Sequence, residues 1–148
     1  MNRENVQRVI DWLRAGAPEA IFTMHYSLHE VSILDEYEQE RLAPSEQAKT
    51  TSCGSVCCIG GYAAQLAGVT PHNNDGNWTN IQDKALEFFG IDTESIFYIQ
   101  WMMPVFSPDL APLRCTPQEA ADALERWADQ DDVNFNPWPP KANSDDPA

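Results

Sequence analysis

The segment 53–68, CGSVCCIGGYAAQLAG, constrains the fold of this chain more than any other part of the sequence. Between Val56 and Ala67 its only strongly polar side chain belongs to Gln65. A helix at the surface of a globular protein carries a polar face, and this segment has almost none. The pattern predicts a helix over about residues 53–67 that is buried on most sides, with the rest of the domain packed around it.

The ends and the glycines of this segment add detail to the prediction. Thr51 or Ser52 can cap the first turn, because a hydroxyl at that position accepts a hydrogen bond from a free backbone N–H. Gly60 and Gly61 each cost a helix about 1 kcal/mol relative to alanine. We therefore expect the backbone of another element to approach the helix closely along the strip of small residues Cys57, Gly61 and Ala64.

Helical patterns also occur on both sides of the central segment. Residues 4–15 and 79–89 each place apolar side chains at helical spacing. Residues 20–34 have no clean period and predict a loop or short helical turns. No hairpin signal is convincing. The sequence therefore predicts a single, mainly α domain over residues 1–130, with about four to six helices in all, arranged around the central one.

The clearest helix signal is Thr116-Pro117-Gln118-Glu119, which combines a capping box with a proline at the first helical position. In the helix that follows, Leu124 and Trp127 should face the core. The opposite side carries a stripe of acidic residues, which are exposed by their phase. We refer to them as the α-stripe: Glu119, Asp122, Glu125 and Asp129.

Residues 131–148 are rich in asparagine, proline and aspartate and predict a disordered tail, with docking of Phe135 or Trp138 as an alternative. This tail holds four acidic residues and one basic residue, which is −3 of the total net charge of −14. The acidity is therefore mainly a property of residues 1–130.

The charge and the apolar pattern exclude several classes of function. With 23 acidic against 9 basic residues, the surface should repel nucleic acid and anionic lipid. No stretch reaches the roughly 18 apolar residues that span a bilayer. The polar start of the chain does not read as a signal peptide, so we expect a cytoplasmic protein with reduced cysteines. Solubility is the simplest reading of the charge, and attraction to a basic protein surface is the functional one.

Two further regions are candidates for partner binding. Residues 35–52 are the least core-like internal stretch and predict an acidic surface segment. Its acids form the cluster Asp35, Glu36, Glu38 and Glu40. The run 97–106 is rich in aromatic residues and methionine around Trp101, and it either closes the core or forms an exposed patch for a partner.

The cysteines suggest metal or thiol chemistry, but both patterns are incomplete. Cys53 and Cys57 have the spacing of one half of a structural zinc site, and the second pair is missing. A thiol at a helix N-terminus has a lowered pKa, which would favour Cys53 as a nucleophile. The papain-like order around it is interrupted by Val56, and no histidine partner is identifiable. We therefore predict no catalytic residue, no metal ligand and no cofactor; the alternative is a cysteine-centred enzyme or zinc-binding protein that uses Cys53 and Cys58.

The central segment resembles a motif of small, uncharacterised proteins of bacteria, phages and other mobile elements. That motif is Cys-Gly-Ser/Thr-x-x-Cys-x-x-Gly followed by an aromatic residue and alanine, and it corresponds here to Cys53–Ala63, with Cys58 as its second cysteine. The Phe-x-Met at 22–24, the tryptophan at 78 and the Thr-Pro at 116 are similar too. The resemblance implies a shared fold over about residues 4–130 and brings no activity, cofactor or catalytic residue.

These observations favour a protein that acts by binding another protein. The partner we expect is one with a basic surface built to hold nucleic acid, as a mobile-element inhibitor of CRISPR or restriction systems would meet. Acids at i, i+3 and i+4 of a helix lie about 4.5–6 Å apart along its axis, comparable to the phosphate spacing of a strand. The predicted interface consists of the α-stripe, the cluster at 35–40 and Trp101.

Overall fold

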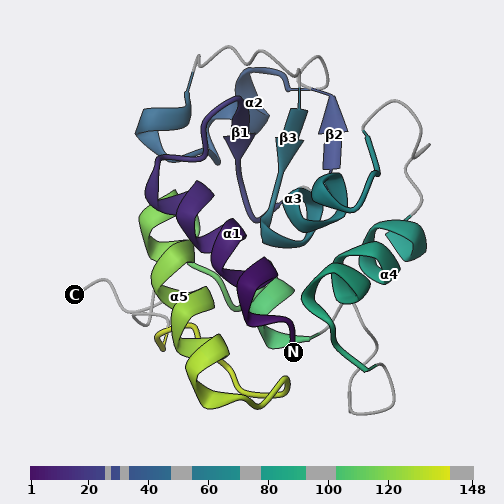
Figure 1. The fold of residues 1–148 in the computed structure, drawn as a ribbon. Helices are drawn as coiled ribbons and strands as arrows, with labels where there is room; N and C mark the ends of the chain where they lie inside the picture. The colour runs from purple at the N-terminus through teal and green to yellow at the C-terminus, as the bar shows by residue number, and fades with distance from the viewer. Residues whose placement is uncertain (26–27, 31–33, 48–54, 71–77, 93–102, 141–148) are drawn as a thin grey trace.

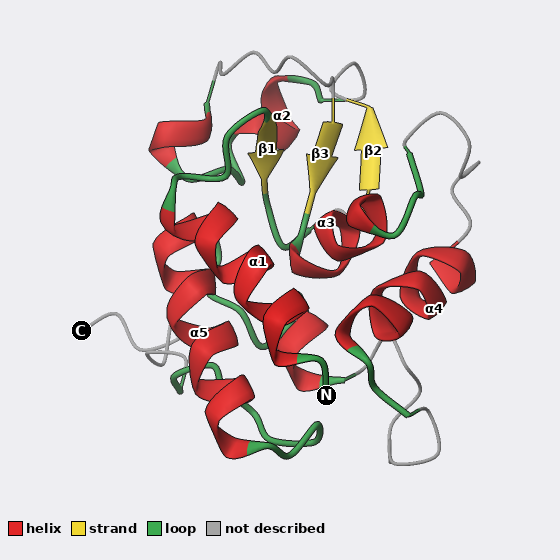
Figure 2. Cartoon of the chain, in the orientation of Figure 1, coloured by secondary structure: helices red, strands yellow, loops and turns green. Residues whose placement is uncertain are grey.

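Five α-helices and a three-stranded sheet make up the described part of the chain (Figures 1 and 2). The computed structural model describes residues 1–25, 28–30, 34–47, 55–70, 78–92 and 103–140, with 78–80 described by their backbone. Helices predominate, as the sequence predicts, but the sheet makes the fold mixed α and β and not purely helical.

Two pairs of helices form the body of the domain (Figure 1). They are α1 (Arg3–Arg14) with α5 (Pro117–Gln130), and α3 (Ile59–Leu66) with α4 (Trp78–Phe89). The helices predicted at 4–15 and 79–89 are confirmed to within a residue at each end. The capping box is confirmed as well. The Thr116 hydroxyl accepts from the N–H of Glu119 at 3.1 Å, and Oε1 of Glu119 accepts from the N–H of Thr116 at 2.9 Å.

The sheet has the strand order β1-β3-β2, where β1 is Ala20–Phe22, β2 is Leu28–Glu30 and β3 is Ser55–Cys57. The central strand β3 pairs in parallel with β1 and antiparallel with β2. In the register, Val56 lies between Ile21 and His29. Segment 20–34, predicted as a loop or helical turns, therefore supplies both outer strands, and that prediction is wrong for the residues that form them.

The predicted central helix over 53–67 is wrong in its first part, since residues 55–57 form a strand and α3 begins only at Ile59. The physical reason is that an apolar run without a polar face fits a strand buried on both faces as well as a buried helix. Neighbouring strands from residues 20–30 decide between the two. The second part of the prediction holds, because most of α3 is buried.

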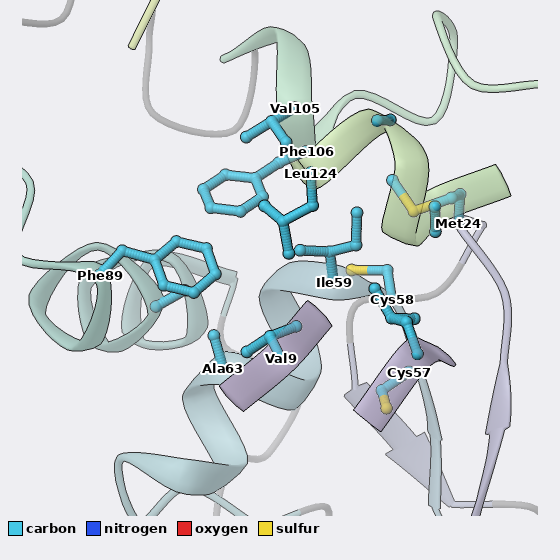
Figure 3. Packing of buried hydrophobic residues seen from close by; sticks show 14 of the residues in the cluster. Val9, Met24, Cys57, Cys58, Ile59, Ala63, Phe89, Val105, Phe106 and Leu124 are labelled. Atoms are coloured by element: carbon cyan, nitrogen blue, oxygen red, sulfur yellow. The ribbon is translucent and has the colours of Figure 1, made fainter. Parts of the chain in front are cut away.

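Cys58 joins β3 to α3 and caps the helix. Its backbone is extended, and its Sγ accepts from the N–H of Gly61 at 3.4 Å. The expected caps, Thr51 and Ser52, lie outside the described residues, and Cys58 takes that role for the helix as observed. At Gly60 an added Cβ would lie 3.5 Å from the ring of Phe106, an ordinary van der Waals contact with a side chain, so the expected close approach of another backbone is not seen at this glycine. Figure 3 shows this packing of Cys58, Ile59 and Phe106 in the main core.

The two faces of the sheet are both covered. Phe22 and Cys57 point into the main core, whereas Ile21 and Val56 form a second, small cluster with Leu42. Leu42 belongs to the segment 34–47, which contains the short helices α2 (Glu36–Gln39) and η2 (Pro44–Glu46). Figure 2 shows α2 behind β1. Most described residues of the predicted surface segment 35–52 are exposed or half-buried, but Leu42, Ala43 and Glu46 are buried, so the segment also covers one face of the sheet.

The beginning of the predicted tail is packed on the domain. Trp138 is only 5% exposed, and its indole N–H donates to the carbonyl of Pro104 at 2.9 Å. Residues 104–106 form the short helix η5 (Pro104–Phe106), which packs against α5. The prediction of disorder is therefore wrong for residues 131–140, where the docking of Trp138 is confirmed. Residues 141–148 lie outside the described part.

Candidate functional site

The α-stripe lies on the exposed side of α5, as predicted, but α1 neutralises most of it. The guanidinium of Arg14 reaches Asp122 at 2.6 Å and Glu125 at 3.0 Å. Hydrogen bonds to Asp122, and then to Glu125, raise the pKa of Arg14. Arg3 lies 3.7 Å from Asp129. These ion pairs link the two helices, so three carboxylates of the α-stripe are engaged within the molecule.

The remaining member of the α-stripe, Glu119, has a local role. One of its carboxylate oxygens closes the capping box with Thr116. Gln118 adds to the joint between the helices, because its amide donates to the carbonyl of Arg14 at 2.9 Å. The stripe thus lies at the surface, and three of its four carboxylates contact arginines of α1.

The acidic cluster on α2 differs from the stripe, because the described part of the chain offers it no cationic partner. Asp35 is the N-cap, and its side chain accepts from the N–H of Glu38 at 2.8 Å. Asp35, Glu36 and Glu40 are exposed, and Glu38 is half-buried. Within the described residues, no lysine or arginine lies at ion-pair distance from any of the four carboxylates.

Tyr37 lies within this cluster and was not among the predicted site residues. Its side chain is 64% exposed, which makes it one of two large apolar residues that stand out from the described surface. Arg41 bonds to the Tyr37 hydroxyl at 2.9 Å and lies 4.9 Å from the centre of its ring. The contacts of Arg41 that are observed are therefore with the tyrosine, and among the described residues it forms no ion pair with the acids. The sequence signal that could have identified Tyr37 as a site residue is an aromatic side chain within a strongly acidic segment.

The described thiols are buried and poorly suited to chemistry. Burial raises the pKa of Cys58, and the N–H groups of Gly61 and Gly60 oppose that effect only in part. Burial, with the charge of Glu119, raises the pKa of Cys115 to about 12. A thiol reacts or binds metal as the thiolate, so both are held in the unreactive form. Cys53, the preferred nucleophile of the alternative reading, lies outside the described residues.

No candidate metal site is present within the described residues. No group of three or more histidine, cysteine, aspartate or glutamate side chains is arranged to hold an ion within the described ranges. His29, on β2, has a pKa that burial lowers. Cys53, one half of the predicted zinc pair with Cys57, lies outside the described residues.

A groove runs between α5 and the segment that follows it. We call it the α5 groove; its volume is about 380 Å³. It is lined by Pro112, Glu119, Asp122, Arg126, Phe135, Asn136, Pro137, Trp138 and Pro139. No pattern in the sequence indicates this groove, because it depends on residues 131–140 folding back along α5 (Figure 1).

Trp101, the last predicted site residue, lies outside the described part of the chain.

Comparison with protein-family models, with curated proteins and with solved structures returned no match. Among the described residues, every helix is too short or too polar to cross a membrane. The site must therefore be argued from its own geometry.

Proposed function

We propose that this protein acts by binding another protein through the surface of α2. The observation that carries the proposal is the contrast between the two acidic sets. The α-stripe is paired with Arg14 and Arg3, whereas the four carboxylates of α2 have no cation among the described residues. Unpaired charges in one place attract a partner of opposite charge and accelerate the encounter.

Tyr37 and Arg41 supply what an acidic cluster alone lacks. Tyrosine and arginine are the side chains most often found at the energetic centre of a protein interface. Here the two are fixed against each other, so ordering them on binding costs little entropy. Acids around an exposed, pre-ordered aromatic ring fit a basic partner surface that contains an apolar recess.

The proposed partner is a protein whose basic surface holds nucleic acid, and the proposed role is that of a cytoplasmic DNA mimic. The net charge of −14 and the unpaired acids of α2 support this form of the proposal. The resemblance to mobile-element proteins suggests the biological setting, an inhibitor of a restriction or CRISPR complex. Such a protein would compete with DNA for the same channel.

The test is competition with DNA. Purified restriction and CRISPR complexes of the host are mixed with a labelled DNA duplex, and displacement by this protein is followed by fluorescence anisotropy. The double variant Glu36→Lys/Glu40→Lys should displace DNA roughly tenfold less well, because it reverses two unpaired charges. Displacement by the native protein should also weaken with added salt.

The matched control is Asp83→Lys/Glu87→Lys, which places the same two reversals at the same i, i+4 spacing on the exposed side of α4. It changes the net charge equally and should displace DNA much more like the native protein. Equal loss in both variants would mean that only total charge matters. Failure to displace DNA, or displacement that salt does not affect, would contradict the proposal.

A further inference from the structure

We propose that the α5 groove is a second binding site, which takes an arginine side chain from an extended peptide of a partner protein. The groove and the α2 surface are separate, so this inference does not depend on the function proposed above. It follows from three properties of the groove: its rigidity, its apolar lining and the charge at its rim.

The wall of the groove opposite α5 is held by hydrogen bonds from side chains of the domain. Arg126 donates its Nε–H to the carbonyl of Pro137 at 2.9 Å. Trp127 donates its indole N–H to Val133 at 3.2 Å, and the indole of Trp138 is anchored at Pro104. Segment 131–140 is thus fixed at several points along its length, and the groove is present before any ligand arrives.

The lining suits a flat, partly apolar group. Phe135 is half-buried, and Pro112 and Pro139 present rigid rings without N–H donors. A planar guanidinium stacks on an aromatic face, and its stem packs on apolar surface. The volume of about 380 Å³ lies at the small end of the range for ligand pockets, so it fits one or two side chains and not a folded domain.

The rim supplies acceptors for a cation. Glu119 and Asp122 are one helical turn apart and line the same side of the groove. The capping box engages Oε1 of Glu119, and Arg14 engages Oδ1 of Asp122, so each carboxylate keeps a second oxygen for which the described residues show no donor. A guanidinium can bridge two such oxygens, which an ammonium does less well.

The charge balance also favours a cationic occupant. Arg126 is the only cation among the lining residues, and its Nε–H is already committed to Pro137. The lining carries a formal charge of −1 (Glu119 and Asp122 against Arg126), and it stays at −1 when Arg14 and its second partner Glu125 are counted with it (three acids and two bases), within a molecule of −14. An anionic peptide would be repelled by the negative lining of the groove and by the negative charge of the whole molecule.

The test uses the peptide acetyl-Gly-Pro-Arg-Pro-Gly-amide and a twin peptide with neutral citrulline in place of arginine. Both are titrated into the full-length, ¹⁵N-labelled native protein, and NMR shifts are followed at the Trp138 indole and at the Arg126 and Phe135 amides. We expect saturable shifts at these groups with a Kd of about 0.1–1 mM for arginine. Citrulline should bind about fivefold more weakly, because it lacks the charge.

The variant Glu119→Gln removes charge but keeps an oxygen for the capping box, because glutamine also serves at that position. It should weaken arginine binding by about threefold or more, whereas Asp83→Asn on α4 changes the net charge equally and should have little effect. Thermal unfolding of both variants checks that the fold is kept. The α2 double variant should bind the peptide with nearly native affinity, which separates this site from the one proposed above.

Three outcomes would overturn the inference. The first is the absence of shifts in the groove at millimolar peptide. The second is equal affinity for the citrulline peptide. The third is an equal effect of Glu119→Gln and Asp83→Asn, which would assign any binding to the general negative field of the protein.

Discussion

At the scale of single residues, Cys58 shows how one side chain serves the fold and loses its reactivity. It follows β3 and caps α3 with its sulfur, and it lies in the main core (Figure 3). A helix N-terminus normally favours a thiolate, whereas burial disfavours it. The pKa of Cys58 is raised, so burial is the larger effect here.

This balance predicts the reactivity of the thiols. In the native protein at pH 7–8, iodoacetamide should label Cys58 and Cys115 only as fast as the chain unfolds, and mild urea should accelerate labelling strongly. The rate at Cys115 should rise as the pH passes about 8.5, the ordinary pKa of a thiol, because the unfolded chain then forms the thiolate while the pKa of about 12 keeps the native thiol protonated. Mass spectrometry of digested protein measures each site.

Small-molecule thiols labelled in parallel are the control for intrinsic reactivity. Labelling of Cys58 at the rate of a free thiol, without urea, would contradict the burial argument and would revive the reading of a cysteine-centred site. A bound metal that native mass spectrometry detects, and that a chelator removes, would revive the reading of a zinc-binding protein.

At the scale of elements, the joint between α1 and α5 depends on Arg14. Its guanidinium contacts Asp122 and Glu125, and its carbonyl accepts from Gln118. Exposed ion pairs contribute little one by one, but a shared arginine between two carboxylates forms a small network. Its side chain is 39% exposed, so water and salt screen part of this effect.

We predict that Arg14→Ala lowers the free energy of unfolding by about 1 kcal/mol, because it removes both ion pairs from the helix joint. Urea unfolding followed by circular dichroism measures the loss. A double-mutant cycle with Asp122→Ala isolates the coupling between the two side chains, which should be about 0.5 kcal/mol and should shrink in high salt. A coupling of zero would show that the pair does not stabilise the joint.

Helices were more predictable than strands in this chain. The helices α1, α4 and α5 carry an apolar stripe or a cap within their own residues, so local sequence identifies them. The strand at 55–57 has no such mark. It is a strand because β1 and β2, from residues 20–30, offer it hydrogen bonds on both sides.

At the scale of the whole molecule, the chain after α5 closes the domain. Residues 131–140 turn back along α5, and Trp138 reaches the core beside η5. The same segment forms one wall of the α5 groove. Stability and the proposed arginine site therefore depend on the same stretch of chain.

Trp138→Ala should destabilise the protein by about 3–5 kcal/mol, because it leaves a cavity where a large aromatic side chain was buried. Urea unfolding gives the value, and Trp138→Phe is the matched control. The phenylalanine variant keeps most apolar contacts and loses the bond to Pro104 and part of the buried ring, so it should cost about 1–3 kcal/mol. A native-like stability of the alanine variant would mean that residues 131–140 do not pack on the core.

The candidate site was predictable in composition and not in arrangement. The acids of α2 and α5 were named from the sequence, since their number and phase are visible there. The sequence does not show which of these acids are paired with a cation, because Arg14 lies more than one hundred residues from Asp122 in the sequence. Tyr37 was missed for a related reason: only the structure shows that its ring stays exposed and is held by Arg41.

The sequence by itself determined the helices with a local signature, the capping box at Thr116 and the strongly negative charge. Each depends on residues a few positions apart or on composition, which need no knowledge of the fold. Tertiary structure alone decided that Val56 lies in a strand, which acids are neutralised, and that Trp138 is buried. Each of these depends on what a distant segment brings into contact, and an apolar run or an acidic stripe fits more than one such partner.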